Sequence, residues 1–315
     1  MERRDIGSLE VSVVGLGCNN FGRRMDEASA HAVVAASVEG GITLFDTADV
    51  YGPDGVSEEI LGRALGRRRD DVVIATKFGF EFGGDPQQKG ASPRWIAAAV
   101  EGSLRRLGTD RIDLYQLHEP DGTVPIDETL GALDLLVVAG KVREVGCSNF
   151  SAAQLHGAMD AATGEGRARF VSVQNHYSVI TREPEPDVID ACLQHGLAFI
   201  PYFPLEGGLL SGKYGAWDDP TPGTRLGNDP RQATRFMTDR NRHLVAELTR
   251  YAADHGHSLL ELAMSWVASR PAVASVIAGA TKVEQVEGNI AAVRWALTDE
   301  DVSAIDAIAQ GAPAA

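Results

Sequence analysis

The sequence alternates short apolar runs with amphipathic segments of helical periodicity along almost all of its 315 residues. The apolar runs are β-branched and lack polar alternation, as expected for parallel strands buried on both faces. The predicted strands are Ser12–Leu16, Thr43–Phe45, Val72–Thr76, Ile112–Leu117, Val142–Cys147, Phe170–Gln174, Ala198–Tyr202 and Ala274–Ile277. The predicted helices are Asp26–Glu39, Ser57–Leu65, Ser92–Leu107, Ile126–Val138, Ser151–Asp160, Glu185–Gln194, Asn241–Arg270 and Lys282–Ile290. Eight strand–helix units favour an α/β fold closed into a (β/α)8 TIM barrel over an open sheet.

Three additions to the barrel are predicted, all within one domain spanning residues 1–315. A barrel of this kind takes about 250 residues and leaves room for insertions. The residues before Ser12 are expected to form an N-terminal β-hairpin that closes the barrel floor. A Gly- and Pro-rich insertion, Leu205–Asp239, follows the seventh strand. An extra C-terminal helix is predicted over Thr298–Ala309, with Thr298 as its cap.

Four polar residues close or follow successive predicted strands. Asp46 ends the second strand, Tyr51 follows five residues later, Lys77 ends the third strand, and His118 ends the fourth. In a parallel barrel these strand ends converge on one mouth, where catalytic groups collect. The four side chains are therefore expected to meet there.

These four residue types together suit proton transfer to a carbonyl oxygen. A free tyrosine has a pKa of about 10, too high for efficient acid–base catalysis near neutrality. The Lys77 ammonium would lower the pKa of Tyr51, and Asp46 would keep Lys77 charged and in place. His118 could donate a hydrogen bond to the carbonyl oxygen that Tyr51 protonates. Each residue also has a purely structural interpretation. Asp46 and Lys77 could form a structural ion pair, His118 could be a core histidine, and Tyr51 could be a loop tyrosine.

Charge and cysteine content exclude several other classes of protein. The formal net charge of −15 argues against binding nucleic acid or anionic membranes, because both require a basic surface. No apolar stretch approaches the roughly 20 residues that span a bilayer. The charged residues Met1–Asp5 are not followed by an apolar run, so a secretory signal is not expected there. The three cysteines are far apart, which is typical of reduced thiols, so a cytoplasmic location is expected. The histidine and cysteine pairs lack companions for a metal site, so no metal is expected.

The sequence resembles the aldo-keto reductases from its first predicted strand to its last helices. The order and spacing of the matching motifs make the resemblance specific. The motifs are Gly15–Cys18, Phe45–Gly52, Ser57–Gly62, Ile74–Lys77, Leu114–His118, Val145–Phe150, Gln174–Asn175, Tyr202–Leu205, Gly208–Lys213, Gly279–Lys282 and Asn289.

The resemblance implies an oxidoreductase that reduces aldehydes or ketones with a hydride from a nicotinamide dinucleotide, usually NADPH. Tyr51 would be the general acid, Lys77 and Asp46 would tune it, and His118 would orient the carbonyl. Small-molecule carbonyls would be the substrates, and the protein would be a monomer or a homo-oligomer. The implied cofactor contacts are Gly17, Asp46, Ser148, Asn149, Gln174, Tyr202, Pro204, Leu205, Lys213, Arg225, Gly279, Thr281, Gln285 and Asn289.

Several of these contacts have an expected task. Ser148, Asn149 and Gln174 would bind the nicotinamide carboxamide, and Tyr202 would stack on the nicotinamide ring. Gly279 and Thr281 precede a helix, whose N-terminus can cradle phosphate. Gln285 and Asn289 are four residues apart and so share a helix face, where the adenine would bind.

The last loop departs from the best-known members, which hold the 2′-phosphate of NADP with a lysine and an arginine there. Gly279 and Gln285 occupy those positions, as in the bacterial reductases and the potassium-channel β subunits. In that branch, a lysine and an arginine in the insertion after the seventh strand supply the positive charge instead. Lys213 and Arg225 match these two residues. Phe203 also replaces the usual serine after the stacking aromatic.

Two alternatives to a carbonyl reductase remain. One is an NADP-binding regulatory subunit with slow turnover, like the channel β chains; those depart from the histidine found at position 118, which favours an enzyme. The other is a Schiff-base aldolase that uses Lys77 as its nucleophile. An aldolase needs a lysine free of carboxylate pairing, whereas Asp46 is expected beside this one.

Overall fold

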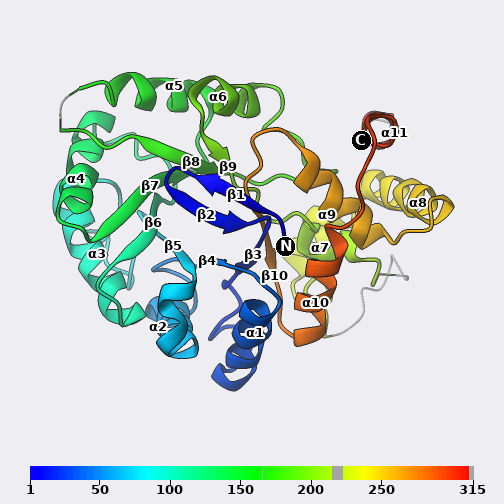
Figure 1. Cartoon of the computed structure of the whole chain (residues 1–315), viewed down its shortest axis with the longest axis horizontal. Coiled ribbons are helices and arrows are strands. Elements are labelled where there is room, and N and C mark those ends of the chain that lie inside the picture. Colours follow the sequence, from blue (N-terminus) through cyan, green and yellow to red (C-terminus); the bar gives the residue numbers. More distant parts are fainter. Residues whose placement is uncertain (165, 215–222, 312–315) are drawn as a thin grey trace.

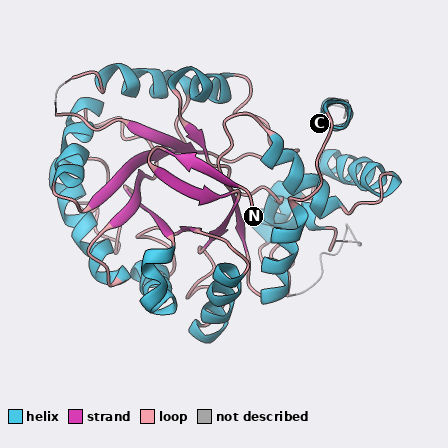
Figure 2. Cartoon of the chain, in the orientation of Figure 1, coloured by secondary structure: helices cyan, strands magenta, loops and turns pink. Residues whose placement is uncertain are grey.

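Eight parallel strands surrounded by helices form the body of the molecule (Figures 1 and 2). The structure is a computed structural model that describes residues 1–164, 166–214 and 223–311. The barrel strands are β3 (Val14–Gly17), β4 (Leu44–Asp46), β5 (Val73–Phe78), β6 (Ile112–Leu117), β7 (Val142–Ser148), β8 (Phe170–Gln174), β9 (Ala198–Phe199) and β10 (Val276–Gly279). The helices are α1 (Glu27–Glu39), α2 (Val56–Leu65), α3 (Pro93–Leu107), α4 (Ile126–Val138), α5 (Ala152–Ala161), α6 (Asp187–His195), α7 (Pro230–Phe236), α8 (Asp239–Asp254), α9 (Leu259–Ser269), α10 (Val283–Ala292) and α11 (Asp299–Gln310).

The sheet curls until its two edge strands meet. The strands pair in the order β10-β3-β4-β5-β6-β7-β8-β9, and every neighbouring pair is parallel. Single bridges join Phe199 to Val273 and Tyr202 to Ile277, and the Ile277 amide donates to the Pro201 carbonyl over 3.0 Å. These bonds connect the β9 and β10 sides of the sheet, and the predicted (β/α)8 barrel is confirmed.

An antiparallel hairpin, β1 (Arg3–Ile6) and β2 (Leu9–Ser12), lies across the barrel in Figure 1. Its tight turn uses Gly7, whose φ of +58° is left-handed. Ile6, Leu9 and Val11 are buried against side chains from inside the barrel, such as Leu114. The hairpin therefore seals one end of the barrel, as predicted, and leaves the opposite end for a site.

Four local features differ from the sequence-based prediction. The helix predicted over Asn241–Arg270 is two helices, α8 and α9, because the chain turns at Gly256 (φ +77°) and Ser258 caps α9. Ser57 does not cap α2; its hydroxyl donates to the Cys18 carbonyl instead. The strand predicted over Ala198–Tyr202 is β9, which is only two residues long. The insertion contains the unpredicted helix α7, although its residues 215–222 lie outside the described part.

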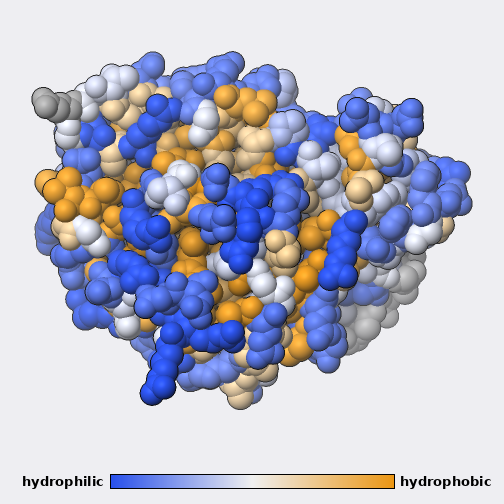
Figure 3. Space-filling model, in the orientation of Figure 1, coloured by the Kyte–Doolittle hydropathy of each residue, from blue (hydrophilic) through white to orange (hydrophobic). Residues whose placement is uncertain are grey.

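The face in Figure 3 is a mosaic of polar and apolar side chains. Apolar side chains gather at its left edge over α4, where Leu135 and Val138 are exposed. Within the described residues, every helix is too short or too polar to cross a bilayer.

Candidate active site

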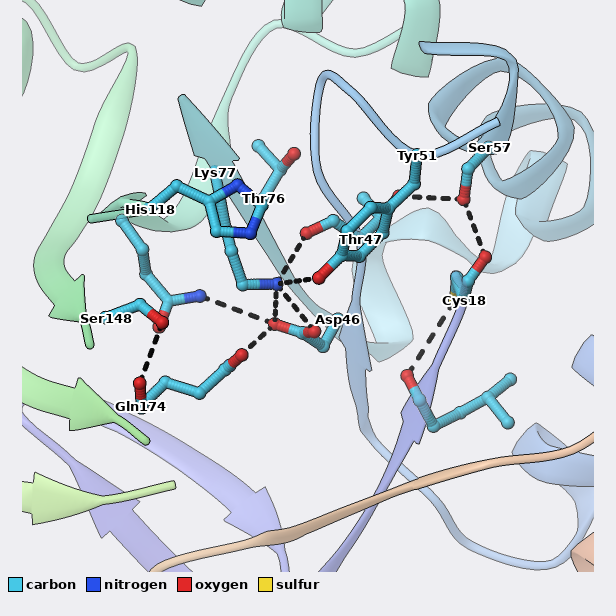
Figure 4. Close-up of polar contacts among 12 residues, drawn as sticks. Cys18, Asp46, Thr47, Tyr51, Ser57, Thr76, Lys77, His118, Ser148 and Gln174 are labelled. Atoms are coloured by element: carbon cyan, nitrogen blue, oxygen red, sulfur yellow. Dashed lines mark hydrogen bonds and ion pairs between the residues drawn. The ribbon is translucent and has the colours of Figure 1, made fainter. Parts of the chain in front are cut away.

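The open end of the barrel brings together Asp46, Lys77 and His118, as the strand ends predicted (Figure 4). Asp46 is the last residue of β4 and pairs in register with Ala75 of β5, which places Lys77 one pleat further along. His118 directly follows β6, and its amide donates to the Phe78 carbonyl at the end of β5. Parallel pairing of three adjacent strands therefore fixes the relative positions of these side chains.

Lys77 is fully buried and is held by three groups. Its ammonium donates to both Asp46 carboxylate oxygens, over 2.8 and 2.7 Å, and to the Thr47 carbonyl over 2.9 Å. Burial alone would lower the pKa of Lys77, but Asp46 and Tyr51 outweigh that effect and raise the pKa. Lys77 is therefore a fixed cation at neutral pH.

Tyr51 reaches the same cation from the loop after β4. Its hydroxyl lies 3.4 Å from the Lys77 nitrogen, and the ammonium lies 4.9 Å from the centre of its ring. Burial raises the pKa of Tyr51 above its ordinary value, and Lys77 opposes that rise without cancelling it. The net direction is opposite to the lowering expected from Lys77 alone, so Tyr51 is a protonated donor at neutral pH.

His118 lies between two aromatic rings. The Tyr51 ring meets it edge-on with centroids 5.7 Å apart, and the Phe80 ring lies 4.1 Å away. Burial, and secondarily the Lys77 charge, lowers the pKa of His118 well below its ordinary value. His118 is therefore neutral near pH 7 and can donate a hydrogen bond without adding charge. Phe80 lies in the loop after β5, and its position in the sequence is compatible with lining a substrate pocket or with packing; the structure shows its contact with His118.

Two side-chain amides also converge on Asp46. Gln174 at the end of β8 donates over 2.9 Å and Gln116 on β6 over 3.4 Å. Gln174 therefore contacts Asp46, a contact that the sequence did not reveal. Gln116 was missed altogether, although a buried polar residue two positions before His118 on a strand points to the same face of the sheet.

A hydrogen-bonded chain continues from Gln174 across the ends of β7 and β8. The Ser148 hydroxyl donates to the Gln174 carbonyl over 2.7 Å. The Asn149 side-chain Nδ2 donates to the His118 carbonyl over 2.9 Å, and the Tyr202 hydroxyl donates to the Asn149 side-chain oxygen over 2.9 Å. All four predicted nicotinamide contacts are thus connected to Asp46 or His118 through hydrogen bonds.

The predicted adenine and phosphate contacts surround the end of β10. Gly17 and Gly279 are paired in register, and a Cβ on Gly17 would lie 3.7 Å from the Gly279 nitrogen. The Gln285 side chain accepts from the Thr281 amide over 2.8 Å and from its hydroxyl over 3.2 Å, so these two predicted contacts bind each other. Asn289 is buried one helical turn after Gln285.

The two predicted phosphate-binding cations lie in the insertion and are linked through Tyr214. The Lys213 ammonium lies 5.3 Å from the centre of the Tyr214 ring, and the Tyr214 hydroxyl accepts from the Leu226 amide. Arg225, the preceding residue, lies 4.8 Å over the Phe203 ring, and its Nε donates to Gln232 over 3.0 Å.

Arg225 belongs to a cationic cluster. Burial, and then Arg24 and Arg23, lower the pKa of its guanidinium to about 10. Because these two arginines follow β3, positive charge gathers at the mouth of a protein with net charge −15.

The remaining predicted contacts line the start of the insertion. Pro204 is buried and Leu205 is half-buried, and the Leu205 carbonyl accepts from the amides of Gly208 and Leu210. Within residues 1–164, 166–214 and 223–311, no group of three or more His, Cys, Asp and Glu side chains has the arrangement of a metal site.

Comparison with known proteins identifies the family. The sequence model described as "Aldo/keto reductase family" matches residues 13–310. A "Probable voltage-gated potassium channel subunit beta" from Oryza sativa subsp. japonica is 35% identical, with 99% of this chain and 98% of that protein covered. The protein of the same description from Arabidopsis thaliana is 34% identical over 93% and 91%. "Probable aldo-keto reductase 1" from Glycine max is 32% identical over 94% and 85%. The chain belongs to the aldo/keto reductase family.

Proposed function

We propose that this protein is an NADPH-dependent oxidoreductase that reduces aldehydes or ketones to alcohols. The observation that carries the proposal is the Tyr51 hydroxyl, held 3.4 Å from an ammonium that is itself bound by Asp46. The family supports an oxidoreductase in general terms. The reductase and its cofactor are our inference from the residues at the barrel mouth.

The roles of the residues follow from their charge states. Tyr51 is protonated, so it can give its proton to a carbonyl oxygen as negative charge develops there. Lys77 stabilises the phenolate that is left behind. Neutral His118 donates a second hydrogen bond to the same oxygen and so fixes the substrate's orientation.

The residues present fit a nicotinamide dinucleotide, which when bound would supply the hydride. Ser148, Asn149 and Gln174 offer amide and hydroxyl groups beside the proton donor, as a carboxamide requires. Gly17 and Gly279 allow β3 and β10 to approach closely at the mouth, because a Cβ on Gly17 would lie 3.1 Å from the Ile277 side chain. Arg225 supplies positive charge for a phosphate.

An aldolase is disfavoured by the same geometry. A Schiff-base nucleophile must be an unprotonated amine, whereas both Asp46 oxygens hold Lys77 as a cation with a raised pKa.

A regulatory subunit is the second candidate, because two relatives carry the description of a potassium channel β subunit. Such a subunit would bind NADPH through the same residues but turn over slowly. The histidine at position 118, beside Tyr51, favours the enzyme.

One assay tests the proposal. NADPH consumption would be followed optically against a panel of aldehydes, ketones and quinones. We expect turnover of about 1 s⁻¹ or faster with at least one compound, within the common range for enzymes. NADPH binding with no turnover across the panel would support the regulatory subunit, and failure to bind NADPH would overturn both candidates.

A further inference from the structure

His176, which none of the roles above uses, stacks against Tyr202. The two rings have centroids 5.5 Å apart and are inclined by only 16°. His176 follows β8 by two residues and is bridged to Tyr202 in the extended backbone. One face of the Tyr202 ring is therefore covered by an imidazole. Tyr202 is the residue to which the resemblance to the aldo-keto reductases assigns stacking on the nicotinamide ring.

The two ring nitrogens of His176 have opposite tasks. An Arg235 nitrogen on α7 lies 3.2 Å from Nδ1. A guanidinium can only donate, so Nδ1 must be the accepting, unprotonated nitrogen. Nε2 therefore carries the proton and donates it to Glu206, whose oxygens lie 3.1 and 3.2 Å away. The contacts thus assign one tautomer to His176.

The buried carboxylate of Glu206 stabilises this tautomer and orientation of His176. Its side chain is fully buried in the insertion Leu205–Asp239, and its backbone has a left-handed φ of +48°. Besides His176 it accepts from the Ser178 hydroxyl. A buried carboxylate without partners is costly, so breaking its bond to His176 would favour a rearrangement of the insertion.

Aromatic rings surround the same histidine. Phe203 and Phe236 meet it edge-on at 5.7 and 6.2 Å, and Arg225 lies over Phe203. Phe236 belongs to α7, as Arg235 does. The nicotinamide-stacking ring, the start of the insertion and α7 are therefore held together through one imidazole.

We propose that His176 is a positioning residue for the cofactor: as the Nε2–H tautomer it links Arg235 to Glu206, and this link holds the Tyr202 ring and α7 in the arrangement that binds NADPH. The inference rests on the proposed function, because it takes Tyr202 as the nicotinamide platform. It adds that NADPH affinity depends on Arg235, a residue that acts through His176.

The first test compares two arginines on one helix. Arg235→Ala removes the donor to His176, and Arg231→Ala removes the same charge one turn earlier on α7, where the side chain is also exposed. We expect Arg235→Ala to raise the Kd for NADPH about tenfold, as loss of a charge-assisted hydrogen bond does, and Arg231→Ala to change it less than about twofold. The KM for the carbonyl substrate should stay constant in both variants.

The second test separates the hydrogen bonds of His176 from its ring. His176→Gln can still accept from Arg235 and donate to Glu206, whereas His176→Phe keeps only a ring. We expect His176→Gln to bind NADPH within about threefold of wild type and His176→Phe about tenfold more weakly. Adding Arg235→Ala to His176→Phe should cost nothing further, because both changes break one link. ¹⁵N-histidine NMR should show Nε2 protonated and Nδ1 bare.

The outcomes separate this inference from the proposed function. If wild-type protein binds NADPH but Arg235→Ala and Arg231→Ala bind it equally well, the positioning role is wrong and the reductase stands. Additive losses in the double variant would show that Arg235 contacts the cofactor directly, which also overturns the inference. If His176→Phe does not fold, the arginine pair and the NMR spectrum still decide. A wild type that does not bind NADPH overturns the proposed function itself.

Discussion

The Lys77 ammonium lies 2.7 Å from an Asp46 carboxylate oxygen and 3.4 Å from the Tyr51 hydroxyl, so one buried cation serves two partners. Asp46 keeps the lysine charged, and the charge is then available to a phenolate formed at Tyr51. Burial disfavours that phenolate, and the raised pKa keeps Tyr51 protonated at neutral pH.

Replacement of Tyr51 tests the proton donor. Tyr51→Phe removes one hydroxyl at the mouth and should leave the fold and NADPH binding unchanged. It should lower kcat for carbonyl reduction by roughly 10²–10⁴, the usual contribution of a general acid. The measurement is steady-state turnover of a good aldehyde substrate, with NADPH Kd as the control. A wild-type rate in this variant would show that Tyr51 is not the acid.

Replacement of Lys77 tests the cation. Lys77→Met leaves Asp46 as a buried carboxylate and takes the countercharge from Tyr51, so reduction should fall at least as far as in Tyr51→Phe. Lys141→Met is the control, because Lys141 pairs with Glu101 away from the mouth. Borohydride added to wild type with substrate should leave no adduct on Lys77 by mass spectrometry. An adduct there would favour the aldolase.

Replacement of Arg225 tests the cofactor preference. Its guanidinium sits with Arg23 and Arg24, and a bidentate contact to the 2′-phosphate is within its chemistry. Arg225→Ala should weaken NADPH binding by about 1.5–3 kcal/mol and leave NADH nearly unchanged. Lys213→Ala should cost less. Titration of both cofactors by fluorescence quenching would measure this. Equal losses for the two cofactors would show that Arg225 does not read the 2′-phosphate.

Asp49 should make stability depend on pH. Its carboxyl is buried, and burial, followed by the charge of Glu58, raises its pKa to about 8. Between the unfolded pKa near 3.8 and about 8, the folded state holds a proton that the unfolded state has lost. Stability must therefore fall as pH rises through this window.

Asp49→Asn removes that titration. The variant should match wild type near pH 4 and exceed it by a few kcal/mol near pH 8.5, since each unit of pKa shift corresponds to about 1.36 kcal/mol. Urea unfolding at the two pH values would measure the difference. Asp54→Asn, at an exposed residue of the same loop, should show no such trend. Parallel pH curves for Asp49→Asn and wild type would refute the prediction.

The hydrogen-bond partners of the predicted cofactor contacts could not be predicted from the sequence. The resemblance assigns Gln285 to the adenine and Thr281 to a phosphate, and in the structure the Thr281 amide donates to the Gln285 side chain. The resemblance assigns Gln174 to the nicotinamide, and in the structure its side chain donates to Asp46. A side chain's partner depends on rotamers and on residues far along the chain, which a single sequence does not specify.

The sequence by itself determined the barrel and the group of polar residues at its mouth. Buried parallel strands require continuous apolar runs, and their ends converge on one mouth, so Asp46, Lys77 and His118 could be placed there from strand ends alone.

Only the tertiary structure decided the net shift of the Tyr51 pKa and the contacts of His176. The first depends on how much water the packed mouth excludes. The second joins residues 176, 206 and 235, which lie on separate segments. Hydrophobic periodicity is a local property of the chain, whereas desolvation and hydrogen bonding between distant residues arise only when the chain has folded.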